Sequence, residues 1–221
     1  MSLRDLPSTH LETASNPMTM STELILKCAQ MSKDVYSCDG EWVSCLDHDA
    51  KTFFLAIQGT NEVGDWKTNL SFLFKSEDTH DGFKRNAWKI AVDVLLSGCL
   101  RDIENDYRIV LTGHSLGGAT AIVLLDLLQN YYTRLALVTF GAPRPGGRLL
   151  RKRVCSYPHY RFVHGSDIVP LTPPATGGYV HTHQPIILGR MSEGAWDPIK
   201  DHAVDLYIRA LMNGYASLSL D

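Results

Sequence analysis

Residues 108–128, RIVLTGHSLGGATAIVLLDLL, contain a short apolar run, a serine between two glycines, and a longer apolar run with helical spacing. The short run predicts a buried strand and the long run predicts a helix. Gly113 and Gly117 flank Ser115 in the pattern G-x-S-x-G, which forms a sharp turn that raises a serine hydroxyl above a sheet. A side chain at either glycine would collide with neighbouring backbone. The stretch therefore predicts a nucleophile and not an ordinary turn.

Strand and helix patterns alternate along the rest of the chain, which predicts an α/β fold with a mostly parallel sheet covered by helices on both faces. Strands are expected at 41–46, 51–58, 109–112, 135–140, 160–163 and within 179–188. Helices are expected over 20–36, 81–100, 117–130, 149–154 and 198–211. The first two strands are joined by a short turn, so we expect an antiparallel hairpin at the N-terminal edge.

The helical pattern at 81–100 predicts an amphipathic helix with Phe83, Trp88, Val92 and Leu95 facing the core. Residues 1–19 read as an irregular arm, and residues 20–221 as a single domain.

A serine nucleophile needs a base, and the base needs an acid that orients it. In folds with this serine turn, the acid and then the histidine follow the serine along the chain. Asp167 comes directly after a predicted strand, and His202 lies at the start of the last predicted helix. His181 and His183 are the alternative bases. Their spacing would place both on one face of a strand and suggests a metal site, but no third ligand has matching spacing, so no metal is expected.

An oxyanion hole in such a site takes one backbone N–H from the residue after the nucleophile, here Leu116. The second donor comes from the loop after an earlier strand. The segment FLAIQGTNEVGDW at 54–66 supplies such a loop, and Thr60 is the expected donor, through its backbone N–H and its hydroxyl.

Several segments resemble, in order, the motifs of the class 3 lipases, the fungal-type triacylglycerol lipases. They are IQGTNEVGDWKTNL at 57–70, HDGFKRNAW at 80–88, GHSLGGATA at 113–121, VTFGAPRPGG at 138–147, HGSDIVPLTPP at 164–174, GGYVHTHQP at 177–185 and DHAVDLYI at 201–208. The resemblance runs over nearly the whole chain, from about residue 20 to residue 212.

The resemblance implies the α/β-hydrolase fold and a carboxylic-ester hydrolase, above all a lipase acting on acylglycerols or related lipid esters. It implies Ser115 as nucleophile, Asp167 as acid and His202 as base, with no cofactor. In the family the segment after the oxyanion residue forms an amphipathic lid helix, and here that stretch, Asn61 to Phe74, is short. There Trp66, Leu70 and Phe72 are candidate lid or substrate-binding residues, with ordinary core packing as the alternative.

The chain also departs from the family pattern. It is compact, and Gln58 stands where an arginine often precedes the oxyanion glycine. The change at Gln58 should not remove the chemistry. An esterase for short-chain or aromatic soluble esters is a second hypothesis, and an inactive hydrolase-fold binding module is a third.

Composition narrows the class of protein further. The formal net charge of −3 gives no reason to expect nucleic acid as a partner. No apolar run is long enough for a membrane span, although transient contact with a lipid interface fits a lipase. The first 20 residues lack the apolar stretch of a signal peptide, and localisation stays open. Five cysteines without metal-site spacing favour free thiols and a cytoplasmic protein.

Overall fold

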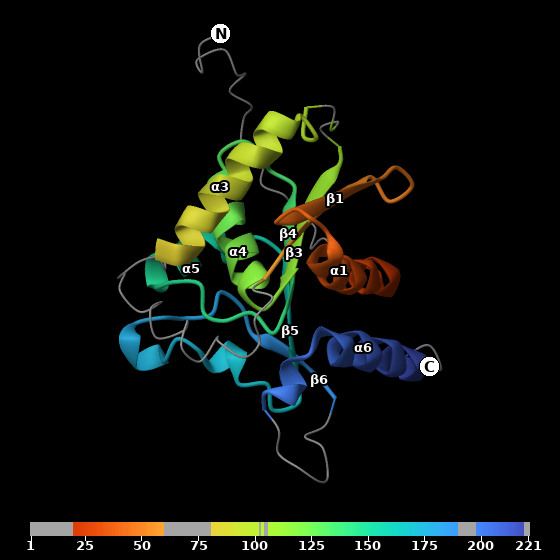
Figure 1. Cartoon of the computed structure of the whole chain (residues 1–221), viewed down its shortest axis with the longest axis vertical. Helices are drawn as coiled ribbons and strands as arrows, with labels where there is room; N and C mark the ends of the chain where they lie inside the picture. Colours follow the sequence, from red (N-terminus) through yellow and green to blue (C-terminus); the bar gives the residue numbers. More distant parts are fainter. Residues whose placement is uncertain (1–19, 60–80, 102, 104–105, 190–197, 219–221) are drawn as a thin grey trace.

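The computed structural model describes residues 20–59, 81–101, 103, 106–189 and 198–218, and a six-stranded sheet lies at its centre (Figure 1). The strands are β1 Trp42–Asp47, β2 Thr52–Ile57, β3 Arg108–His114, β4 Leu135–Phe140, β5 His159–His164 and β6 Pro185–Leu188. They lie in chain order across the sheet. β1 and β2 are antiparallel, and each later neighbouring pair is parallel. The predicted mostly parallel sheet with an antiparallel edge hairpin is confirmed.

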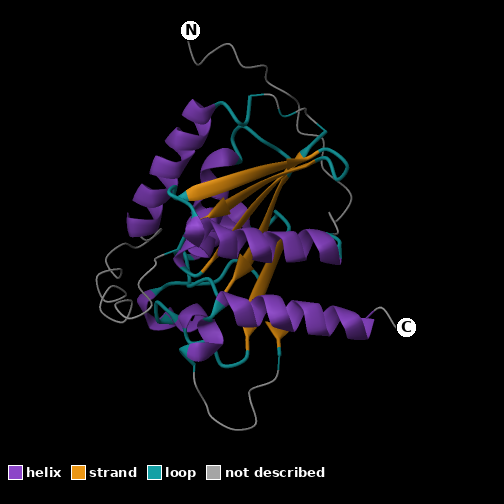
Figure 2. Ribbon diagram, turned by 45° about the vertical axis from the view of Figure 1, so that its right-hand side comes forward, coloured by secondary structure: helices purple, strands orange, loops and turns teal. Residues whose placement is uncertain are grey.

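Helices cover both faces of this sheet, as predicted (Figure 2). They are α1 Thr22–Asp34, α3 Asp81–Ser97, α4 Leu116–Leu128, α5 Arg148–Val154 and α6 Val204–Leu218. The alternation of β2 side chains explains the two layers. Phe53, Leu55 and Ile57 pack against α3 and α4, whereas Phe54 points to the opposite face and packs with α1 and α6.

The prediction for the inner face of α3 is wrong for three of its four residues. Phe83 is buried, but the exposed fractions of Trp88, Val92 and Leu95 are 53%, 46% and 56%. The buried face instead continues through small and medium side chains at Ala87, Ile90, Ala91 and Val94. α3 packs on α4, and alanines at the contact let two helices approach closely, so the helix is rotated away from its larger apolar stripe.

The predicted closing helix over 198–211 is also divided in the structure. Lys200–His202 form a 3₁₀ turn, and α6 begins at Val204. Ala203 between them is extended, with φ −62° and ψ 127°, and this conformation interrupts the helix. His202 therefore lies on a turn ahead of α6, where its side chain is positioned independently of the helix.

The expected late strand is shorter than predicted. β6 covers only the last four residues of 179–188, and Val180 forms an isolated antiparallel bridge with Gly146. The expected arm at 1–19 lies outside the described residues, as do Thr60 and the candidate lid residues Trp66, Leu70 and Phe72. All five cysteines are free thiols. Within the described part of the chain, no helix combines the length and apolar character that crossing a membrane requires.

Candidate active site

The serine turn between β3 and α4 has the strained geometry that the sequence pattern predicts. Ser115 has φ 56° and ψ −129°, a backbone conformation that residues other than glycine rarely adopt. A Cβ on Gly113 would lie 2.5 Å from the carbonyl carbon of Gly117, and one on Gly117 would overlap the carbonyl oxygen of Ile57. Such a conformation costs on the order of 1–3 kcal/mol, so the surrounding structure must hold the serine in place.

Leu116 is the first residue of α4. Its backbone N–H has no acceptor within the helix, because the first turn of an α-helix lacks preceding carbonyls. The positive end of the helix dipole lies at the same point. The N–H of Leu116, the oxyanion donor expected from the sequence, therefore lies at the positive end of α4.

Asp167 and His202 are brought together as a buried pair. The Nδ1–H of His202 donates to Oδ2 of Asp167 at 2.8 Å, and the two side chains are 6% and 0% exposed. The backbone N–H of Val169 donates to Oδ1 of the same carboxylate at 2.9 Å. With Nδ1 committed to the carboxylate, Nε2 is the ring nitrogen of His202 that can take a proton.

The end of β4 links the serine turn to this acid–base pair. The Ser115 N–H donates to the carbonyl of Phe140 at 2.9 Å. The next residue, Gly141, has φ +60°, and a Cβ there would lie 2.7 Å from Asp167 Oδ2 and 3.0 Å from His202 Nδ1. Ser115 directly follows β3, and Asp167 lies in the loop after β5, so both lie beyond the carboxyl ends of parallel strands, where such sheets place their active groups.

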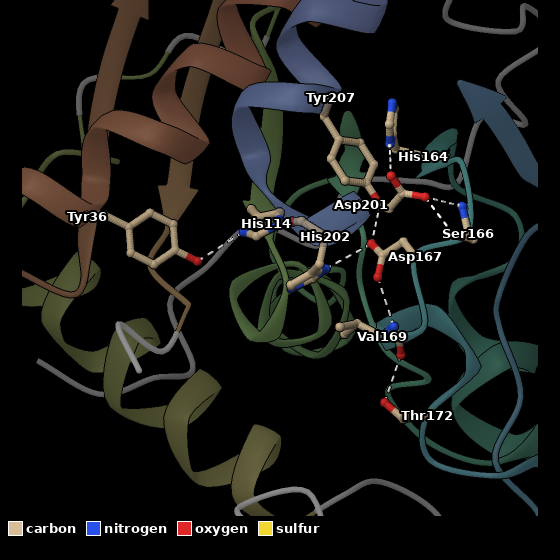
Figure 3. A network of polar contacts seen from close by, with 10 residues as sticks. All are labelled: Tyr36, His114, His164, Ser166, Asp167, Val169, Thr172, Asp201, His202 and Tyr207. Atoms are coloured by element: carbon tan, nitrogen blue, oxygen red, sulfur yellow. Dashed lines mark hydrogen bonds and ion pairs between the residues drawn. The ribbon is translucent and has the colours of Figure 1, made fainter. Parts of the chain in front are cut away.

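A tyrosine that sequence reasoning missed completes the contacts of Asp167. The Tyr207 hydroxyl donates to Oδ2 of Asp167 (Figure 3). Burial, together with the charge of Asp167, raises the pKa of Tyr207 well above its usual value, so the hydroxyl stays protonated. No spacing rule identifies this residue, because it lies 40 positions from the aspartate.

A second carboxylate, Asp201, connects the loop that carries Asp167 with the turn that carries His202. Its Oδ2 accepts from the backbone N–H of Ser166 at 2.7 Å and from the Ser166 hydroxyl at 2.6 Å (Figure 3). Burial alone would raise the pKa of Asp201, but the bonds from Ser166 outweigh it and hold that pKa below its usual value. Ser166 is the neighbour of Asp167, and Asp201 is the neighbour of His202. The bonds between Ser166 and Asp201 therefore hold Asp167 and His202 at a fixed distance.

His114, the residue before the serine, is a further part of the site that the sequence analysis overlooked. Its ring lies against that of His202, with centroids 4.4 Å apart, and its Nε2–H donates to the His202 carbonyl at 2.7 Å. Tyr36, just after α1, contacts its Nδ1 at 3.2 Å. The position of a histidine inside the G-x-S-x-G pattern was the one available signal.

The alternative bases lie in another polar cluster. His181 Nε2–H donates to the carbonyl of Pro170 at 2.7 Å, and the ring of His183 packs edge-on against that of His159 at 5.1 Å between centroids. His159 is held between the hydroxyls of Thr139 and Thr182 at 2.8 and 2.9 Å. The residues that the structure describes hold no group of three or more His, Cys, Asp or Glu side chains placed to bind a metal ion.

Comparison with known proteins identifies relatives. Residues 54–177, more than half of the chain, match the family model for lipase (class 3). A secreted mono- and diacylglycerol lipase 1 of Fusarium solani is 32% identical over 145 residues, covering 62% of this chain and 44% of the relative. A lipase of Rhizomucor miehei is 32% identical over 146 residues, covering 59% of this chain and 40% of the relative. The match thus spans less than half the length of either relative.

Solved structures give the same fold. The lipase from Rhizopus microsporus var. chinensis superposes with a TM-score of 0.63 at 21% identity, covering 89% of this chain and 95% of that one. The Rhizomucor miehei lipase–propeptide complex gives a TM-score of 0.62 at 24% identity, covering 83% and 77%. The α/β-hydrolase fold expected from the sequence is confirmed.

Proposed function

The chain belongs to the class 3 lipase family, and from that premise we propose that it is a serine carboxylic-ester hydrolase acting on lipid esters. The observation that carries the proposal is the buried bond from His202 to Asp167, and the strained conformation of Ser115 supports it. Each part serves acyl transfer from an ester to water.

In the proposed cycle, Nε2 of His202 removes the proton of the Ser115 hydroxyl as the oxygen attacks the ester carbonyl carbon. Asp167 holds the imidazole in the tautomer whose Nε2 carries no hydrogen, and it stabilises the imidazolium that forms. The imidazolium then gives its proton to the leaving alcohol. Water, activated by the same nitrogen, releases the acid from the acyl-enzyme.

The developing oxyanion is received by backbone donors in this proposal. The N–H of Leu116, at the first turn of α4, is one of them. Thr60 remains the proposed second donor, and Trp66, Leu70 and Phe72 the proposed lid or substrate-binding residues; all four lie outside the described residues.

Acylglycerols are the proposed substrates because three of the curated relatives are named for mono- and diacylglycerols. A series of p-nitrophenyl esters and acylglycerols of increasing chain length, with and without an emulsion, tests this. Preference for long chains supports the lipase. Preference for short soluble esters would assign the protein as an esterase instead.

The nucleophile is tested by Ser115→Ala, with the exposed Ser156→Ala as matched control. We expect Ser115→Ala to fold, to lose ester turnover by at least about a thousandfold, and to lose labelling by a fluorophosphonate probe. Full labelling or turnover in Ser115→Ala would refute the mechanism. A folded wild-type protein without either activity would indicate an inactive binding module.

A further inference from the structure

A chain of contacts connects the end of β2 with the loop of His202. The Tyr36 hydroxyl lies against Gly59, where an added Cβ would come within 2.3 Å of the hydroxyl oxygen. That hydroxyl lies 3.2 Å from Nδ1 of His114, and Nε2 of His114 lies 2.7 Å from the His202 carbonyl oxygen (Figure 3). Residues from four distant parts of the sequence therefore form one continuous path.

The chemistry of the end groups fixes the direction of every bond in this path. A carbonyl oxygen can only accept, so Nε2 of His114 carries the hydrogen. Burial, and secondarily the nearby ring of His202, hold the pKa of His114 well below its usual value, so the imidazole is neutral and its Nδ1 accepts. Burial raises the pKa of Tyr36 to about 12, so its hydroxyl keeps the proton that it donates to Nδ1.

The close approach of Tyr36 depends on Gly59. A Cβ at this position would overlap the Tyr36 hydroxyl and would lie 2.9 Å from the carbonyl oxygen of His114. Gly59 directly precedes Thr60, the proposed oxyanion donor. The Tyr36 hydroxyl therefore touches the main chain one residue before the proposed oxyanion hole.

We propose that Tyr36 and His114 are positioning residues that hold the end of β2 at Gly59 and the His202 loop in a fixed relation. The inference rests on the proposed function. The bond from His114 to the His202 carbonyl fixes the position of the His202 backbone. The two rings lie 4.4 Å apart between centroids, so the His114 ring limits rotation of the His202 ring. Both nitrogens of His114 are occupied, so it supports the base without competing for the serine proton.

The matched test compares two tyrosine–histidine pairs. Tyr107 contacts Nδ1 of His48 at 2.9 Å on the surface, so Tyr107→Phe removes the same kind of bond as Tyr36→Phe. We expect Tyr36→Phe to lower kcat for a p-nitrophenyl ester about tenfold with KM within about twofold, because a misaligned His202 stabilises the transition state less well. Tyr107→Phe should leave both constants within about twofold of wild type.

Active-site titration with a fluorophosphonate separates positioning from folding. A purely structural role would reduce the labelled fraction of the protein and leave kcat per labelled site unchanged, and this result would overturn the proposal. We expect a reduced kcat per labelled site. In His114→Ala, the added change Tyr36→Phe should lower kcat by less than about twofold, since the path is already broken. Independent, multiplying losses would also overturn it.

The same assays distinguish the two levels of inference. If hydrolysis depends on Ser115 but Tyr36→Phe behaves like Tyr107→Phe, the positioning role is wrong and the proposed function stands. If the folded wild-type protein shows no hydrolysis that Ser115→Ala abolishes, both the function and the positioning role are wrong.

Discussion

Acidification should destabilise the folded chain through His181. Its Nε2–H donates to the buried carbonyl of Pro170, and burial, with the charge of Arg161 acting in the same direction, lowers its pKa from 6.5 to about 3. An unfolded chain takes up a proton at this imidazole near pH 6.5, whereas the folded chain does not. The unfolded state therefore binds more protons, and the free energy of unfolding falls as the pH drops below 6.5.

The size of this effect follows from the two pKa values. Each pKa unit is worth about 1.4 kcal/mol, so lowering the pH from about 7.5 to about 5 removes about 2 kcal/mol of stability through His181 alone. That is a large part of the roughly 5–15 kcal/mol that stabilises an ordinary domain. His114 and His159 are buried with pKa values well below 6.5, so both act in the same direction.

The assay is chemical denaturation between about pH 5 and about pH 8, for wild type and His181→Gln. A glutamine amide can keep the donor to the Pro170 carbonyl but cannot take up the proton. The variant should lose about 2 kcal/mol less than wild type on acidification. The exposed His48→Gln is the control and should follow wild type. Parallel curves for wild type and His181→Gln would refute the reasoning.

Three other predictions concern the site. Ser115→Gly should be more stable than Ser115→Ala by about 1 kcal/mol in thermal unfolding, because only glycine relieves the positive φ; equal stability would argue against strain. Tyr207→Phe should lower kcat by about tenfold to thirtyfold through its lost bond to Asp167, and an unchanged kcat would contradict that. Asp201→Ala should lower kcat about tenfold, whereas Asp201→Asn, whose amide oxygen still accepts from Ser166, should recover most of it.

The sheet and its covering helices were predictable because local sequence patterns indicate each strand and helix. The serine turn requires glycines wherever it occurs, and buried parallel strands appear as short apolar runs. The orientation of α3 was not predictable in this way. The helix offers two apolar faces, and contact with α4, not residue size, selects the face that carries Ala87 and Ala91. Hydrophobic periodicity alone cannot decide between two such faces.

In the candidate site, the order of residues along the chain predicted Asp167 and His202. The residues that support this pair could not be predicted. Asp167 and His202 were expected from the sequence and lie in contact. Tyr36 and Tyr207 were missed because their contacts join residues 78 and 40 positions apart. Such pairs follow from the packing of whole helices on the sheet, which no local spacing encodes.

The pairing of the first and last described helices has a consequence for how the chain is made. α1 and α6 lie side by side on one face of the sheet, where Ile25 and Cys28 share a buried cluster with Tyr207 and Leu211 (Figure 2). On a ribosome, α1 emerges long before the helix that covers it. Its apolar side then stays uncovered through most of synthesis, which makes this surface a natural point of contact for chaperones. The proposed hydrolytic activity should appear late in translation, once α6 has docked and the His202 turn that precedes it is in place.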